Sequence, residues 1–180
     1  MKQKMITTLR TLLALTLGLG AMGPAPVLAQ DPPRIVIGPG VIEPMPIAVP
    51  TFIDEGGAGD YAAAISGVVI SDLEGTGFFR NIPEDAHISK ITSFDGGVAF
   101  EDWKAINSQV LITGAVTVAG DRITVKFRAY DVFNGQVLDG AALQFAGTTD
   151  SWRRMAHKVS DVIYSKITGE GGYFDSRVVF

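Results

Sequence analysis

The sequence contains no cysteine and only two histidines, His87 and His157, in 180 residues. Without cysteine the chain can form no disulfide, no thiolate nucleophile and no cysteine-ligated zinc site. A Ser-His-Asp triad would have to use one of the two histidines. The chain also has no excess of basic residues, because 15 Lys+Arg stand against 19 Asp+Glu and give a formal net charge of −4. Nucleic-acid binding depends on neutralising phosphates, so the charge disfavours that function.

The first residues have the pattern of a targeting segment. The first ten residues hold three basic residues and no acid, and residues 11–22 are free of charge and mostly apolar. That stretch is too short to span a bilayer, and small residues end at Ala29 before Gln30. The pattern predicts a secretory signal peptide over residues 1–29, cleaved between Ala29 and Gln30, and export to the periplasm of a Gram-negative bacterium. A retained membrane anchor is the alternative.

Proline divides the rest of the chain, because eight of the nine prolines lie at or before position 50. Proline lacks an N–H and biases its predecessor toward extended backbone, so residues 30–48 are predicted to form an extended arm outside the sheet. One proline-free apolar segment, Arg34-Ile35-Val36-Ile37, lies within this arm. It can be an edge strand of the following domain, or a strand that adds to the sheet edge of another protein.

After the arm the pattern becomes that of a globular domain. Alternating apolar residues and turn signals such as Asn134-Gly135 predict a three-stranded antiparallel meander, and helical spacing predicts two long helices. The expected strands are 49–53, 78–82, 109–118, 122–132 and 136–145, and the expected helices are 61–74, 101–107 and 151–167. We therefore expect an α/β fold: a single two-layer domain over 49–170 with a mixed sheet and both long helices on one face.

No pattern in the sequence predicts an enzyme. A glycine-rich loop at Gly56–Gly59 lies between a strand and a helix, but it lacks the order of a phosphate-binding motif and has acids beside it. His157 and Asp161 are four residues apart on a helix, which indicates a surface ion pair. His87 lies in a loop without metal-ligand spacing. We expect no cofactor and no metal; a hydrolase that relies on His157 and a periplasmic small-ligand-binding module remain as alternatives.

A specific set of residues runs through the whole predicted domain. In the meander and last helix it comprises Leu111-Ile112-Thr113-Gly114, Tyr130-Asp131-Val132, Gly135-Gln136, Arg154, Ala156, His157, Asp161, Ile163 and Tyr164. It continues with Thr168-Gly169-Glu170, Gly172 and Phe174, and begins with Arg34-Ile35-Val36-Ile37, Pro46-Ile47-Ala48-Val49-Pro50 and Phe52. With these residues the chain resembles the TolB family, periplasmic components of the Tol-Pal system.

The resemblance implies a protein-interaction scaffold that links inner and outer membrane and serves outer-membrane invagination at cell division and envelope integrity. It implies that the arm, through Arg34, Ile35, Val36 and Ile37, contacts the C-terminal domain of TolA. It also implies a C-terminal β-propeller that contacts Pal. Residues 171–180 would then be a linker and the first strand of that propeller, which makes the sequence a fragment whose Pal-binding half is missing.

Overall fold

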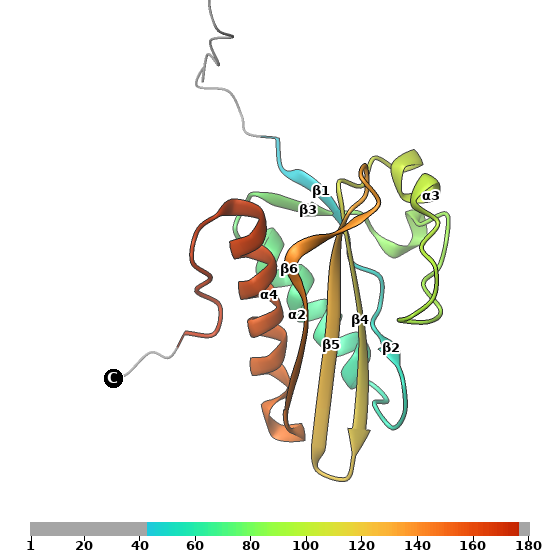
Figure 1. Ribbon diagram of the computed structural model, residues 1–180. Helices are drawn as coiled ribbons and strands as arrows, with labels where there is room; N and C mark the ends of the chain where they lie inside the picture. Colours follow the sequence, from blue (N-terminus) through green and yellow to red (C-terminus); the bar gives the residue numbers. More distant parts are fainter. Residues whose placement is uncertain (1–42, 177–180) are drawn as a thin grey trace, which may run out of the picture. The chain divides into compact units, whose positions relative to one another are not determined.

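The computed structural model describes residues 43–176, which form an open mixed sheet with helices (Figure 1). The strands run in the order β3-β1-β4-β5-β6, and β2 pairs with β4 beside β1. The strands are β1 (Met45–Ala48), β2 (Ile53–Asp54), β3 (Phe79–Asn81), β4 (Val110–Ala119), β5 (Arg122–Asp131) and β6 (Gln136–Thr148). The helices are α2 (Tyr61–Gly75), α3 (Phe100–Ala105) and α4 (Trp152–Thr168), with short 3-10 turns η1 (Glu84–Ala86) and η2 (Thr149–Ser151). The predicted α/β class, mixed sheet and meander are confirmed, while the signal peptide lies outside the described residues.

Strand β1 corrects two expectations from the sequence. It is parallel to both β3 and β4, and Ile47 and Ala48 are completely buried. Residues 45–48 were expected in the arm but belong to the middle of the sheet. The strand expected at 49–53 is wrong as well. Strand β1 ends at Ala48, before Pro50, and the chain pairs with the sheet again only at Ile53, where β2 begins farther along β4.

Pro46 is tolerated in this central strand because of its register. Its carbonyl accepts a hydrogen bond from Gln109 N at 2.9 Å, while Ile47 is the first residue of β1 paired with β4, opposite Val110. An N–H group at position 46 would point toward the residues that precede β4, where no strand is present to accept a hydrogen bond. Proline at this position therefore costs the sheet no hydrogen bond.

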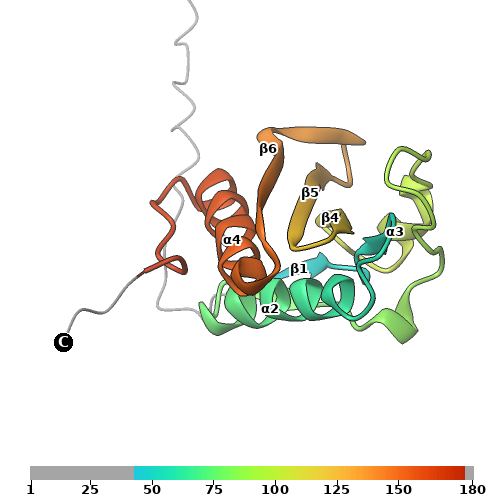
Figure 2. The same cartoon turned by 90° about the horizontal axis from the view of Figure 1, so that it is seen from below.

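The two long helices pack on one face of the sheet and against each other (Figure 2). Their apolar spacing follows the predicted periodicity, and the buried residues of both helices join the inward residues of β4 and β5 in one core cluster. In this core the ring of Phe52 lies close to the backbone of Gly114 in β4, and a side-chain carbon at position 114 would overlap the ring. Glycine is therefore required at that position, because the Phe52 ring lies directly over the backbone.

The opposite face is only partly covered, by the segment that connects β3 to β4. Within it, α3 lies over the sheet and inserts Trp103, which is fully buried against Ala48, Leu111 and Tyr130. His87 contacts the Trp103 ring edge-on, with the ring centroids 4.9 Å apart. The rest of this face, formed by residues 122–128 of β5 and by β6, is exposed or only half-buried. We call it the open face.

The hairpin predicted at Asn134-Gly135 forms, but with a longer turn than the dipeptide predicts. Gly135 has φ +65, whereas Asn134 keeps a negative φ. The loop spans residues 132–135, and Asp131 organises it by accepting hydrogen bonds from Asn134 N at 3.0 Å and Asn134 Nδ2 at 2.6 Å. The connection is therefore a four-residue loop held by the Asp131 side chain, and not a tight two-residue turn.

Candidate functional site

The predicted partner-binding residues Arg34, Ile35, Val36 and Ile37 lie outside the described residues, as do Ala29 and Gln30 of the predicted cleavage site. The structure does describe the place where the chain joins the sheet. Met45 N donates to Phe78 O at 2.8 Å, and Ile82 N donates to Ile47 O at 2.8 Å. With the bond to Pro46 on the other side, β1 is held by both neighbouring strands from its first residue.

The glycine-rich loop is occupied by the protein's own carboxylate. Asp54 accepts hydrogen bonds from Gly56 N at 2.7 Å, Ala58 N at 3.0 Å and Gly59 N at 3.1 Å. These N–H groups are the ones that a bound phosphate would need. The loop is therefore a closed structural turn that connects β2 to α2.

The same contacts make Asp54 an acid-sensitive group. The N–H groups of Ala58, Gly56 and Gly59 favour the charged form and lower the pKa of Asp54 below its ordinary value of 3.8. Because the folded pKa is the lower one, the stabilisation is present above the unfolded pKa and is lost as pH falls through the folded pKa. We expect the NMR amide shifts of these three residues to titrate together with a midpoint below 3.8, and not to titrate in an Asp54→Asn variant. A midpoint at or above 3.8 would contradict this assignment.

Both histidines connect elements of the fold. His157 Nδ1 lies 2.8 Å from Asp72 Oδ2, which joins α4 to α2, so the predicted ion pair with Asp161 is wrong. His87 Nε2 lies 3.0 Å from the carbonyl of Ile82. Within residues 43–176 no group of three or more acidic or histidine side chains is placed to hold a metal ion. No described helix has the length and apolar character needed to cross a membrane.

The C-terminal strap, residues 169–175, folds back along α4 and is fastened to it by side chains. Asp161 accepts hydrogen bonds from the backbone N–H groups of Phe174, at 2.7 Å, and Asp175, at 3.1 Å. Arg154 Nε donates to both carboxylate oxygens of Asp175, at 2.9 and 3.1 Å. A side-chain carbon at Gly172 would lie 2.5 Å from Asp161, so the strap can approach the helix this closely only with glycine there.

Tyr164 forms the apolar half of the same attachment. Its hydroxyl donates to Glu170 Oε2 at 3.0 Å, and its ring contacts those of Tyr173 and Phe174 at centroid distances of 5.5 and 5.8 Å. Burial, followed by the hydrogen bond to Glu170, raises the pKa of Tyr164. Asp161, Tyr164 and Phe174, which are among the residues that carry the family resemblance, thus lie together where the strap contacts α4.

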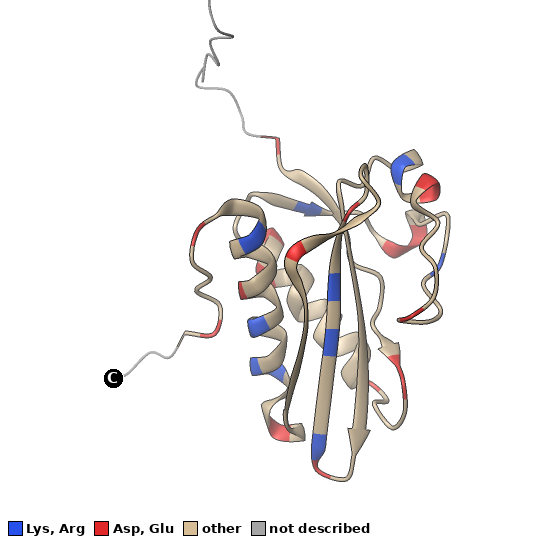
Figure 3. Ribbon diagram, in the orientation of Figure 1, with Lys and Arg blue, Asp and Glu red and all other residues tan. Residues whose placement is uncertain are grey.

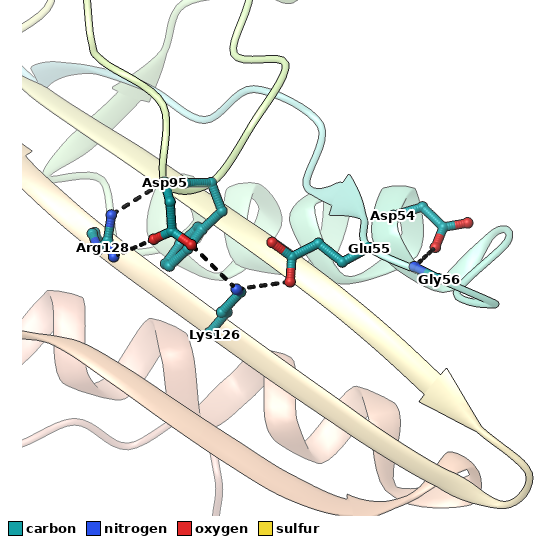
Figure 4. A network of polar contacts seen from close by, with 7 residues as sticks. Asp54, Glu55, Gly56, Asp95, Lys126 and Arg128 are labelled. Atoms are coloured by element: carbon teal, nitrogen blue, oxygen red, sulfur yellow. Dashed lines mark hydrogen bonds and ion pairs between the residues drawn. The ribbon is translucent and has the colours of Figure 1, made fainter.

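A second polar network lies on the open face of the sheet (Figure 4). Lys126 of β5 binds Glu55 at 2.7 Å and lies 4.0 Å from Asp95, while Arg128 binds Asp95 at 2.8 Å. Both cations lie over the ring of Phe94, at 4.6 and 4.2 Å from its centroid. The alternation along β5 places these two cations on the open face, but their acidic partners come from other elements and were not predicted.

Comparison with known proteins gives a consistent result. The family model described as "TolB amino-terminal domain" matches residues 33–138, which is more than half of the chain. A protein of Cereibacter sphaeroides (strain ATCC 17029 / ATH 2.4.9) named "Tol-Pal system protein TolB" is 59% identical over 179 residues, covering 97% of this chain and 40% of its own. A protein of the same name from Ruegeria sp. (strain TM1040) is 60% identical over 177 residues, covering 97% of this chain and 39% of its own. The chain thus spans about 40% of the length of these relatives.

A solved structure supports the fold. The crystal structure of TolB from Acinetobacter baumannii matches with a TM-score of 0.59 at 24% identity, over 73% of this chain and 30% of that one. At this identity the similarity supports the fold alone.

Proposed function

The chain belongs to the TolB family, and from that premise we propose that it is the amino-terminal part of a periplasmic scaffold of the Tol-Pal system. In this role it links inner and outer membrane and serves outer-membrane invagination during division and envelope integrity, without catalysis. The observation that carries the proposal is the family match from residue 33 to 138, which includes the predicted partner-binding residues.

We propose that the arm binds the C-terminal domain of TolA by adding a strand, with Arg34, Ile35, Val36 and Ile37 as the contact residues. Three consecutive β-branched residues favour extended backbone, and main-chain hydrogen bonds supply affinity in such complexes. Pro39 cannot donate a ladder hydrogen bond, so the added strand ends near Ile37. The arm leads directly into β1, which is hydrogen-bonded on both sides, so tension on the arm is carried by the middle of the sheet.

The other end of the domain fits the same role. The strap on α4 fixes the direction in which the chain leaves the domain, before residues 177–180, which are not described. We propose that the complete protein continues there into the β-propeller that contacts Pal. Residues 1–29 act as the signal peptide, and residues 30–44 form the arm.

The arm can be tested directly by replacing Ile35 and Ile37 with aspartate. Burial of each aliphatic side chain contributes about 1.5–3 kcal/mol, so we expect the affinity for the TolA C-terminal domain to fall about a hundredfold or more. Isothermal titration calorimetry measures the change. A matched control replaces Val41 and Ile42 by aspartate, beyond Gly40 in the same arm, and should bind like the original chain. Unchanged affinity in the Ile35→Asp/Ile37→Asp variant would refute strand addition by the arm.

A further inference from the structure

Strand β6 forms an edge of the sheet that is open among the described residues. It pairs with β5 alone, and after an irregular stretch between Val137 and Ala142, which contains Gly140 at φ +70, it pairs regularly to Thr148. Open edges are normally protected by charged residues, proline or bulges. The regularly paired part, residues 142–148, has no charged residue and no proline.

The register shows which backbone groups of β6 are unpaired. Thr149 N donates to Asp121 O at 2.7 Å, which sets the alternation of hydrogen-bonded pairs between β5 and β6. In that alternation Ala142, Gln144 and Ala146 direct their N–H and C=O groups away from β5, and all three residues are exposed. They can pair with a further strand without any change in the sheet.

A groove lies on each side of this same segment. The groove on the open face has a volume of about 420 Å³ and is lined by Ala142, Gln144, Lys126 and Arg128. The groove on the helix side has a volume of about 190 Å³ and is lined by Phe145, Ala146, Arg154 and Lys158. Successive side chains of a strand point to opposite faces, so a strand added to β6 would place its side chains alternately in the two grooves.

The charge of the two grooves selects the kind of strand. Four of the lining residues are cations, and three of them have an acidic partner in the described structure: Lys126 pairs with Glu55, Arg128 with Asp95 and Arg154 with Asp175. The side chains of these three cations remain 26%, 31% and 49% exposed, so each can contact a further carboxylate. In the part of the chain that the structure describes, Lys158 makes no ion pair; its ammonium lies 5.8 Å from the centre of the Phe145 ring. Figure 3 shows basic residues on α4 and on β5, on either side of β6.

We propose that residues 142–146 of β6 bind an extended acidic segment of a partner protein as an additional strand. Its main chain pairs with Ala142, Gln144 and Ala146, and its carboxylates contact the cations of the two grooves. A second copy of this chain is disfavoured as the occupant, because two β6 edges would bring the same cations together. This partner surface is separate from the arm and does not depend on the proposed contact with TolA.

The test uses the full chain and a blocked peptide of sequence Thr-Glu-Val-Glu-Glu-Val-Thr, which carries carboxylates on both faces of a strand. We expect the NMR amide shifts of residues 142–146 to change on titration, and the changes to weaken as salt is added. The same peptide with glutamine in place of glutamate is the control and should bind much more weakly. Shift changes that are absent, that lie elsewhere, or that are equal for the two peptides would overturn the proposal.

Protein variants test separately the charge contacts and the main-chain pairing of the proposed strand. Lys158→Gln should weaken binding up to about fivefold, whereas Arg80→Gln on β3, at the opposite edge, should not. Gln144→Pro removes an outward N–H and should abolish binding, while Gln144→Ala retains it; thermal unfolding confirms that both variants are folded. Equal binding by these two variants would exclude strand addition.

If the peptide bound only after removal of residues 30–42, the arm would be the natural occupant and the proposal would be wrong.

Discussion

Replacing Trp103 by alanine is expected to lower the free energy of unfolding by about 3–5 kcal/mol. The side chain is fully buried between α3 and the sheet, and it is the largest in the cluster that it forms with Ala48, Leu111, Tyr130 and Val132. Its neighbours Leu111 and Tyr130 lie in β4 and β5, whose ladders prevent them from collapsing into the cavity. Urea unfolding followed by circular dichroism measures the loss.

Two variants show whether the cavity is the cause. Trp103→Phe keeps an aromatic ring and removes an indole N–H that has no hydrogen-bond partner among the described residues, so its cost should be below about 1.5 kcal/mol. Trp152→Ala removes the same side chain from a half-buried position on α4 and should cost less than Trp103→Ala. Equal losses at the two tryptophans would contradict the view that Trp103 fastens the connection from β3 to β4.

Elements with a local pattern could be predicted from the sequence. On β5 the inward Ile123, Val125 and Phe127 alternate with Lys126 and Arg128, and this period of two needs no knowledge of distant residues. The same holds for the helical spacing of α2 and α4, whose predicted and observed ends differ by at most one residue. Local patterns therefore gave the meander, both long helices and the fold class.

Strand β1 could not be found in this way. Only Ile47 and Ala48 are fully buried in it, and the strand is bordered by Pro44 and Pro50 and contains Pro46. Local propensity predicts an extended arm for such a segment. Its place in the sheet is determined by the hydrogen bonds that Met45 N donates to Phe78 O and that Pro46 O accepts from Gln109 N, residues distant in the sequence. Tertiary pairing overrides propensity here.

The side-chain contacts between distant elements were hidden for the same reason. The partner of His157 is Asp72, 85 residues away, so helical spacing selected the nearer but wrong Asp161. The role of Asp54 was not predicted either, because the acids beside the glycine-rich loop were considered only as groups that repel an anion. A local signal was present, since an aspartate two residues before a glycine commonly binds the backbone of the turn that follows. The family residues named from the sequence included Asp161, Tyr164 and Phe174 of the strap contact but not Tyr173 or Asp175, and the geometry of the contact became apparent only in the structure.

Replacing Asp161 by alanine is expected to release the strap from α4 while the domain stays folded. Hydrogen bonds to a charged group contribute about 1.5–3 kcal/mol, and Asp161 accepts two from the strap, so the amides of Phe174 and Asp175 should exchange with solvent about tenfold faster or more. Arg154→Ala leaves these bonds intact and removes only the contact with Asp175, so it should have a smaller effect. Hydrogen exchange measured by NMR distinguishes the variants.

The matched control is Asp150→Asn, which changes an exposed acid beside the first turn of the same helix and should leave both amides protected. Because the strap is the last described segment before the chain leaves the domain, its release would allow whatever follows to change direction relative to α4. In the proposed scaffold role, tension applied at β1 would pass through the sheet and a rigid strap to the next part of the protein, whereas a released strap would absorb that tension. If Asp161→Ala left the exchange of both amides unchanged, the carboxylate would not be the attachment, and this account of load transfer through the domain would fail.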